Sequence, residues 1–402
     1  MRIDRRSSRL SFRKQRRVGC LSPTLLLGVV LGGLITLSWN WLGQWFSAGA
    51  PTNETLVDLK SVEAAFNQGD LDRAVELAQQ MLAVEPDNTA ARVLLVHALI
   101  YRSYTEYNRD ADRDAALRSA SAAAAEKPLD NDLQAAYAFA LQASQQPATA
   151  VEVARKVLDR QPDHALARMA LALAYSGVGS HDVALRESLR AVASPGWRVD
   201  THRALALAYS GVGDYRNAID SVERAIRLND RLIPLYFERA LYARQIGDAD
   251  AATVAYFRVL ALDSNNVKAR FRLCELSSVL REREAAIDYC RQVTELAPAW
   301  PDGWYQLGRE YFLQGNFRLA QQNLNRCSTL QVEQGTPVEE RRFECWYLQG
   351  QAAEILGDCP ALLATYNEYR AMANVAGLTQ TWIYPPEGPT FCITPIVPTV
   401  AA

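Results

Sequence analysis

Residues 177–184 read GVGSHDVA and residues 211–218 read GVGDYRNA, so one pattern returns after 34 positions. In both stretches a glycine is followed by a polar residue, and an alanine stands five positions after that glycine. The same spacing joins three other pairs: Gly69 with Ala74, Gly247 with Ala252, and Gly315 with Ala320. A fixed period of this length is typical of solenoids. The sequence therefore predicts a stack of similar units.

Each unit reads as two helices joined by a short turn. Glycine ends the first helix because it adopts a positive φ at little steric cost. The Asp, Asn or Ser that follows can cap the second helix. About 17 residues after the turn, Pro86, Pro162 and Pro298 stand where a helix must stop. These signals predict an all-α chain built from helical hairpins.

The unit that begins at Pro301 shows the full pattern of large and small residues. Its two helices carry Trp304, Leu307, Gly308 and Tyr311, then Ala320, Leu324 and Cys327. This pattern resembles the tetratricopeptide repeat (TPR). The resemblance implies a right-handed superhelical solenoid of about nine hairpins over residues 55–376. The units would start near Thr55, Thr89, Asn131, Ala165, Val199, Ile233, Val267, Pro301 and Phe343.

The chain departs from the 34-residue frame in several places. Two insertions of eight residues each fall near residues 101–113 and 335–342. The units at Asn131 and Val267 lack the turn glycine, so we expect their turns to be built differently. The tail, residues 377–402, contains five prolines and several aromatic residues. It is too apolar for a free linker, so we expect part of it to lie against the last hairpin.

The first fifty residues have a composition of their own. Residues 24–46 form an uncharged stretch of 23 positions, enough for a helix to cross a ~30 Å hydrocarbon core. Residues 1–20 hold eight Arg or Lys and one acid, a charge of +7. The positive-inside rule then places residues 1–22 in the cytoplasm and the repeats outside it, after a linker of residues 47–54. We expect a single-pass cell-membrane protein with an extracytoplasmic TPR domain.

Other interpretations of this N-terminal segment stay open. Residues 47–50 are small, as at a signal-peptide cleavage site, although the apolar stretch is long for a signal peptide. Lipidation of Cys20 is disfavoured because this cysteine precedes the apolar stretch instead of following it. Gly28 and Gly32 have the spacing that lets two membrane helices pack closely. The sequence does not decide the oligomeric state.

Charge and motif content argue against nucleic acid as a ligand and against catalysis. The total charge of −2 leaves −9 on the residues after the first twenty, whereas phosphate binding needs a basic surface. The four histidines (His97, His164, His181 and His202) form no metal-spaced cluster, and no P-loop or dinucleotide fingerprint is present. We therefore predict a protein that is not an enzyme and needs no cofactor.

Six of the seven cysteines lie after residue 270. On the repeat frame they form three candidate pairs: Cys274 with Cys290, Cys327 with Cys345, and Cys359 with Cys392. The first pair lies within one hairpin, the second flanks the later insertion, and the third would pin the tail. An extracytoplasmic location permits disulfides. The alternative, that Cys replaces Ala or Gly at small core positions, stays open.

The first helices of successive TPR units line a concave groove, so the resemblance implies a protein or peptide partner there. Carried over position by position, the predicted lining is Arg203, Phe237, Lys268, Phe271, Arg272, Tyr305, Arg309, Phe312 and Tyr347. Aromatic and cationic side chains are common at peptide-binding surfaces. The alternative for Phe237 and Phe271 is packing between neighbouring helices.

One subclass of TPR proteins clamps two carboxylates with basic and amide side chains. Arg203, Lys268 and Arg272 match its basic positions, but Glu238 would repel a carboxylate, so that clamp is not predicted. An acidic or mixed-charge partner segment near Lys268 and Arg272 is the hypothesis that remains. The function expected from all these features is a membrane-anchored scaffold for protein–protein interactions. The alternative is an accessory subunit of a membrane-bound enzyme or of an envelope or glycan-export complex, with catalysis in the partner.

Overall fold

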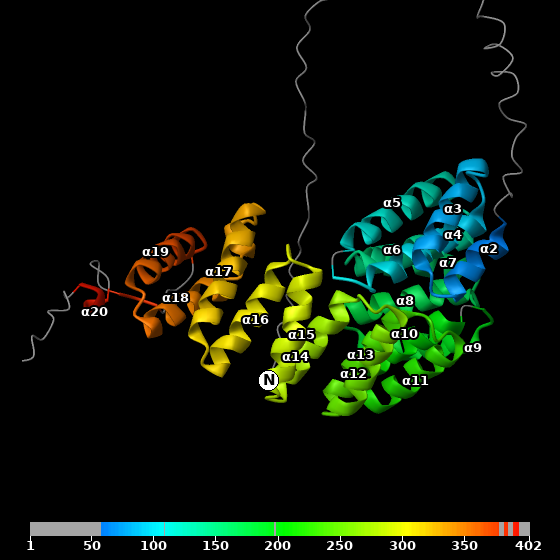
Figure 1. Cartoon of the computed structure of the whole chain (residues 1–402). Helices are drawn as coiled ribbons and strands as arrows, with labels where there is room; N and C mark the ends of the chain where they lie inside the picture. Colours follow the sequence, from blue (N-terminus) through cyan, green and yellow to red (C-terminus); the bar gives the residue numbers. More distant parts are fainter. Residues whose placement is uncertain (1–57, 108, 197, 378–381, 385–388, 394–402) are drawn as a thin grey trace, which may run out of the picture.

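The computed structural model of the chain describes residues 58–107, 109–196, 198–377, 382–384 and 389–393. Within these residues every regular element is a helix (Figure 1). Eighteen of the helices, α2 to α19, follow one another as nine hairpins. The all-helical solenoid that the repeat predicts is therefore confirmed.

The first five hairpins are α2 (Leu59–Asn67) with α3 (Leu71–Val84), α4 (Thr89–Ser103) with α5 (Asp110–Glu126), α6 (Asn131–Ala143) with α7 (Pro147–Arg160), α8 (Ala165–Gly177) with α9 (His181–Ala193), and α10 (Arg198–Gly211) with α11 (Tyr215–Leu228). The last four are α12 (Ile233–Gln245) with α13 (Ala249–Leu262), α14 (Val267–Val279) with α15 (Arg283–Leu296), α16 (Pro301–Gln314) with α17 (Phe317–Glu333), and α18 (Glu344–Leu356) with α19 (Cys359–Val375). A 3₁₀ turn, η1 (Val338–Glu340), precedes the last hairpin, and the short helix α20 (Thr390–Ile393) follows it.

In five of the nine hairpins the second helix starts at a side-chain cap. Asp70, Asp214 and Asp248 each accept a hydrogen bond from the backbone N–H three residues further on. These carboxylates cap α3, α11 and α13 and satisfy donors that the first helical turn leaves unpaired. Where Asp or Asn follows the turn glycine it therefore caps the second helix, whereas Ser180 makes no such hydrogen bond.

Outside the second hairpin, the turn between the two helices has one geometry whether or not it contains glycine. Gln145 and Arg281 stand at the turn with φ of 62° and 64°, close to the 82° of Gly213. At all three turns the next backbone N–H donates to the carbonyl five positions earlier, at 2.9 Å. The expectation that the turns without glycine are built differently is wrong. The hydrogen bonds of the turn hold non-glycine residues in a left-handed conformation that is sterically unfavourable.

Small residues let the two helices of a hairpin approach closely. In seven of the second helices an alanine near the start is completely buried: Ala74, Ala150, Ala184, Ala218, Ala252, Ala286 and Ala320. Gly308 of α16 faces Leu324 of α17, where a Cβ would lie 2.7 Å from the leucine Cγ. Real Cβ atoms almost never approach other atoms so closely, so this crossing depends on glycine.

The stack curves enough for its first hairpins to contact later ones (Figure 1). Tyr101, at the end of α4, is completely buried and donates a hydrogen bond to Asp200 of α10 at 2.8 Å. The same ring belongs to one apolar cluster with Leu232 and Leu235, at the start of α12. The second hairpin therefore packs on the first helices of the fifth and sixth hairpins.

The C-terminal tail packs on the last hairpin at Trp382. This indole is only 7% exposed and makes edge-on ring contacts with Tyr347 of α18 and Tyr366 of α19. It also lies against Gly350, where any Cβ would collide with the indole ring. The expectation that part of the tail lies on the last hairpin is met by this residue.

The N-terminal predictions fall on residues that the structure does not describe. The basic segment 1–22, the proposed membrane helix 24–46 and the linker 47–54 all lie outside the described residues. Among the helices that are described, none combines the length and apolar character needed to cross a bilayer.

Candidate peptide-binding surface

The predicted lining lies on five first helices, α10, α12, α14, α16 and α18. We call the surface that these side chains form the inner-helix surface. Its early part comprises Arg203, Phe237, Lys268 and Phe271, and its late part comprises Arg272, Tyr305, Arg309, Phe312 and Tyr347. The two parts differ because the connection between α4 and α5 lies on the early part. We call residues 104–107 of that connection the inserted loop.

Arg203 is buried and fully engaged. Its guanidinium is 2.7 Å from the Glu238 carboxylate of α12. The rings of Tyr101 and Tyr104 cover the guanidinium, with centroids 5.3 and 5.1 Å from its central carbon. Burial raises the pKa of the Glu238 carboxyl, and the Arg203 charge opposes that rise. This corrects the expectation that Arg203 is open to a partner, because two tyrosines of the second hairpin occupy its surface.

Lys268 is also occupied by the second hairpin. Its Nζ donates to the main-chain carbonyl of Tyr104 at 2.5 Å and lies 4.5 Å from the centroid of the Phe237 ring. Burial, followed by the nearby charge of Arg272, lowers the pKa of Lys268 to about 8. Phe237 in turn packs against Tyr256 of α13, with ring centroids 6.1 Å apart. Phe237 therefore packs between neighbouring helices, as the alternative interpretation of this residue expected.

The late part of the surface is more exposed. The Arg272 side chain is 41% exposed and pairs with Glu275 one turn further along α14. The Arg309 side chain is 38% exposed, and Phe312 lies one turn beyond it on α16 and is half-buried. Cationic and aromatic groups therefore remain accessible on consecutive first helices, which is the combination that protein interfaces favour.

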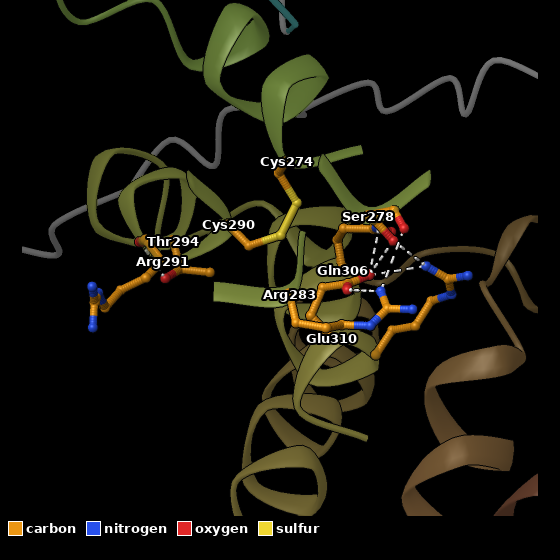
Figure 2. The surroundings of a disulfide bond; sticks show 9 residues. Cys274, Ser278, Arg283, Cys290, Arg291, Thr294, Gln306 and Glu310 are labelled. Carbon is orange, nitrogen blue, oxygen red and sulfur yellow. Dashed lines mark hydrogen bonds and ion pairs between the residues drawn. A yellow bond between two sulfur atoms is a disulfide. The ribbon is translucent and has the colours of Figure 1, made fainter. Parts of the chain in front are cut away.

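The Glu310 carboxylate fixes the position of Arg309. Glu310 is completely buried and accepts hydrogen bonds from Ser278 of α14 at 2.5 Å and from Arg283 of α15 at 2.6 Å. Arg309 donates to the same carboxylate at 3.0 Å. Figure 2 shows Ser278, Arg283 and Glu310 converging beside the Cys274–Cys290 disulfide. One buried acid thus joins three helices and orients an exposed cation.

Tyr305 and Tyr347 are partly covered by the chain itself. The guanidinium of Arg342, whose Nε donates to Asp302 at 2.6 Å, lies 4.6 Å from the Tyr305 centroid. The Tyr347 ring meets Trp382 of the tail edge-on, 5.7 Å between centroids. Both tyrosines remain half-buried. They form the floor of the late part, and Arg272, Arg309 and Phe312 are its more accessible members.

Three disulfides lie in the C-terminal third of the chain. Cys274 of α14 and Cys290 of α15 close the seventh hairpin, with Cα atoms 5.2 Å apart (Figure 2). Cys327 of α17 and Cys345 of α18 join the last two hairpins across η1, with Cα atoms 6.0 Å apart. Cys359 of α19 and Cys392 of α20 hold the tail, with Cα atoms 5.5 Å apart.

The residues that the sequence-based prediction missed are those of the inserted loop, together with Trp300 and Glu310. The one available signal for the loop is the eight-residue excess near residues 101–113, a stretch that contains three tyrosines and a glutamate. Nothing in the pattern pointed to Glu310, because a carboxylate on a solenoid usually faces solvent. Across the described part of the chain, no group of three or more His, Cys, Asp or Glu could hold a metal ion.

Comparison with known families finds two models, both described as tetratricopeptide repeat. One matches residues 138–197 and 203–272, and the other matches residues 301–331. The matched segments cover the middle hairpins and the eighth hairpin. No curated protein matches the chain.

Several solved structures are similar to the chain at low sequence identity. The Cut9-Hcn1 hetero-tetramer of the APC/C is 15% identical with a TM-score of 0.51, over 75% of this chain and 56% of that one. This chain thus spans little more than half of that neighbour. The human IFIT1 dimer with PPP-AAAA is 16% identical with a TM-score of 0.46, over 65% and 69%. YrrB, described as a TPR protein with an unusual peptide-binding site, is 20% identical with a TM-score of 0.36, over 45% and 94%. From the family matches and the hairpin architecture together, the chain contains tetratricopeptide repeats.

Proposed function

We propose that this chain is a TPR scaffold that residues 24–46 anchor in a membrane and that binds a protein partner outside the cytoplasm. The partner would dock on the late part of the inner-helix surface. The observation that carries the proposal is the partial exposure of Arg272 and Arg309 beside half-buried aromatic rings. Arginine and aromatic side chains contribute most of the binding energy at many protein interfaces.

Two features support the extracytoplasmic location. Three disulfides suit an oxidising compartment, because the cytosol keeps thiols reduced. The basic residues all precede the uncharged stretch 24–46, which favours a cytoplasmic N-terminus. Protease added to intact cells should therefore digest the repeats, and repeats that stay protected until the membrane is opened would contradict this topology.

Charge reversal on α14 tests the binding site. Arg272→Glu should abolish co-purification of the partner after gentle detergent extraction, because the reversed charge repels an acidic or mixed-charge segment. Arg291→Glu on α15 is the matched control. Both arginines lie in the seventh hairpin and pair with an acid three positions away, and both side chains are substantially exposed. Equal loss of the partner in both variants, or in neither, would contradict the proposal.

The identity of the captured protein discriminates the alternative function. One stoichiometric enzyme that co-purifies with the chain would indicate an accessory subunit with catalysis in the partner. Several non-enzymatic proteins that compete for the same surface would indicate a general scaffold. In both cases binding must depend on Arg272 for the proposed site to stand.

A further inference from the structure

The connection between α4 and α5 contacts the start of α14, which is distant in the sequence. Residues 178–180 suffice to join α8 to α9, whereas residues 104–109 join α4 to α5. The inserted loop within this connection makes three hydrogen bonds to residues 161 to 164 positions later in the chain. All three partners lie at the start of α14. The extra residues therefore serve a contact with the inner-helix surface and are not needed to close the hairpin.

The start of α14 binds the main chain of the loop, which forms a turn at the end of α4. Asn266 Nδ2 donates to the carbonyl of Thr105 at 3.1 Å, and Lys268 Nζ donates to the carbonyl of Tyr104 at 2.5 Å. Bonds to main-chain carbonyls do not depend on the side chains of the bound segment. A segment of another chain that adopts the same turn can therefore accept hydrogen bonds from the same two donors.

The loop also presents a carboxylate to the first turn of α14. Glu106 Oε1 accepts a hydrogen bond from the backbone N–H of Val267 at 3.1 Å. A helix N-terminus favours a negative group because its first N–H donors are unpaired and its dipole is positive there. The charge of Lys268 acts in the same direction. An acidic side chain already occupies this position, so the structure itself defines the chemistry of its ligand.

An aromatic side chain follows the acid. The Tyr107 ring stacks on Trp300, with centroids 4.3 Å apart and planes at 20°. Phe271 of α14 contacts the same indole at 4.6 Å between centroids. Val267, Val293 and Ala297 complete this apolar site. The inserted loop thus places Glu106 at the N-terminus of α14 and the next residue, Tyr107, in the apolar site.

We propose that the early part of the inner-helix surface is a second peptide-binding site, which the chain's own inserted loop occupies in this structure. Its external ligand is a protein segment that adopts the same turn and carries an acidic residue followed directly by an aromatic residue. This site rests on Asn266, Val267, Lys268 and Trp300, whereas the proposed function rests on Arg272 and Arg309, so either can fail alone.

The loop can be displaced by an external segment because it is less deeply buried than the end of the helix before it. Tyr101 of α4 is completely buried, whereas Tyr104, Thr105, Glu106 and Tyr107 are all only partly buried. An external segment must displace the tethered loop. The apparent affinity of that segment is therefore its intrinsic affinity multiplied by the fraction of time that the loop is unbound. Weakening the loop should therefore strengthen the binding of a peptide with the same sequence.

A labelled peptide of the loop sequence tests the proposal on the full chain in detergent. The probe is YTEYNRD, residues 104–110. Fluorescence anisotropy should show that the Glu106→Ala, Tyr107→Ala double variant binds it at least about tenfold more tightly than the wild type does. The altered peptide YTAANRD should bind at least about tenfold more weakly than YTEYNRD. Lys268→Glu added to the double variant should reduce binding, and Arg291→Glu should not.

A folded double variant that binds neither peptide would overturn the proposal and leave the loop as a brace. If the double variant does not fold, hydrogen exchange on the wild type provides the measurement. Excess YTEYNRD should accelerate exchange at the amides of Tyr104, Thr105 and Tyr107 by displacing the loop, whereas YTAANRD should not. Unchanged exchange at saturating peptide would also overturn the proposal. Neither readout needs the natural partner, so both are independent of the Arg272 test.

Discussion

Gly350 and Trp382 show how a single missing side chain positions the C-terminal tail. A Cβ on Gly350 would collide with the indole of Trp382, although the glycine lies inside α18. Glycine normally costs about 1 kcal/mol in a helix interior relative to alanine. The glycine is therefore unfavourable for the helix and necessary for the packing of the tail. The sequence contains both residues but does not show that the tryptophan requires the glycine, because they meet only after the tail folds back.

The effect of Gly350→Ala should change sign with its neighbour. In the wild type the substitution should destabilise the chain by about 1–3 kcal/mol through overpacking. In a Trp382→Ala background it should stabilise the chain by up to about 1 kcal/mol through helix propensity. Denaturant titration of the four proteins in the double-mutant cycle measures both values. The same effect in both backgrounds would contradict the proposed collision.

Lys268 should make stability depend on pH in the alkaline range. Its pKa is about 8 in the folded chain, below the ordinary lysine value of 10.5 that applies when the chain is unfolded. The folded state therefore loses this proton first, and the free energy of unfolding should rise as pH increases from about 8 to 10.5. The charged groups that face it are Arg272, Glu106, Arg113 and Glu238.

The measurement is the difference in unfolding free energy between the wild type and Lys268→Met. From pH 8 to 9.5 this difference should shift in favour of the wild type by roughly 1–2 kcal/mol, given about 1.4 kcal/mol for each pKa unit. Urea titrations at several pH values provide the data. A pH-independent difference would mean that Lys268 is not perturbed by burial.

At the scale of elements, the repeat pattern accounts for the helices and their caps but overstates the role of glycine. Gln145 and Arg281 adopt the left-handed conformation without glycine, because hydrogen bonding within the turn fixes their backbone. The repeat pattern could not show that these two residues adopt a positive φ, since the local backbone preference of a non-glycine residue disfavours it at any position. The decisive contribution comes from the two packed helices, which determine where the chain must reverse.

Substitution of glycine at these two turns should increase the stability of the chain. Arg281→Gly and Gln145→Gly should each stabilise the chain by roughly 0.5–1 kcal/mol, because relief of left-handed strain exceeds the added entropy of the unfolded chain. Gln68→Gly is the control, since Gln68 ends α2 with an ordinary φ of −80°. That control should be destabilising. Thermal unfolding distinguishes the three variants, and stabilisation of the control would invalidate the explanation.

At the scale of the whole molecule, the disulfides divide the stack. All three lie between Cys274 and Cys392, whereas hairpins one to six, within the described residues, contain none. Closing loops of 16, 18 and 33 residues contributes about 3 kcal/mol each on chain-entropy grounds. In a solenoid each hairpin contacts mainly its neighbours, so this stabilisation should stay local.

Reduction should therefore loosen only the C-terminal third. Hydrogen exchange in α14 to α19 should accelerate under reductant, while α6 to α9 should keep their protection. Alkylation of the unreduced, denatured chain followed by mass spectrometry should show one modified cysteine of the seven. Seven modified cysteines in exported protein would contradict the disulfides.

The sequence by itself determined the units of this protein: helical hairpins of about 34 residues, their Asp and Asn caps, their buried alanines and the turns that contain glycine. Those features depend on neighbours within one period, so they are visible as a local pattern. The tertiary structure alone decided that Arg203 and Lys268 face the chain's own second hairpin. The Lys268 contact joins residues 164 positions apart and depends on the accumulated curvature of the four hairpins between them. A small change in the angle between hairpins would separate them, and no local pattern encodes that angle.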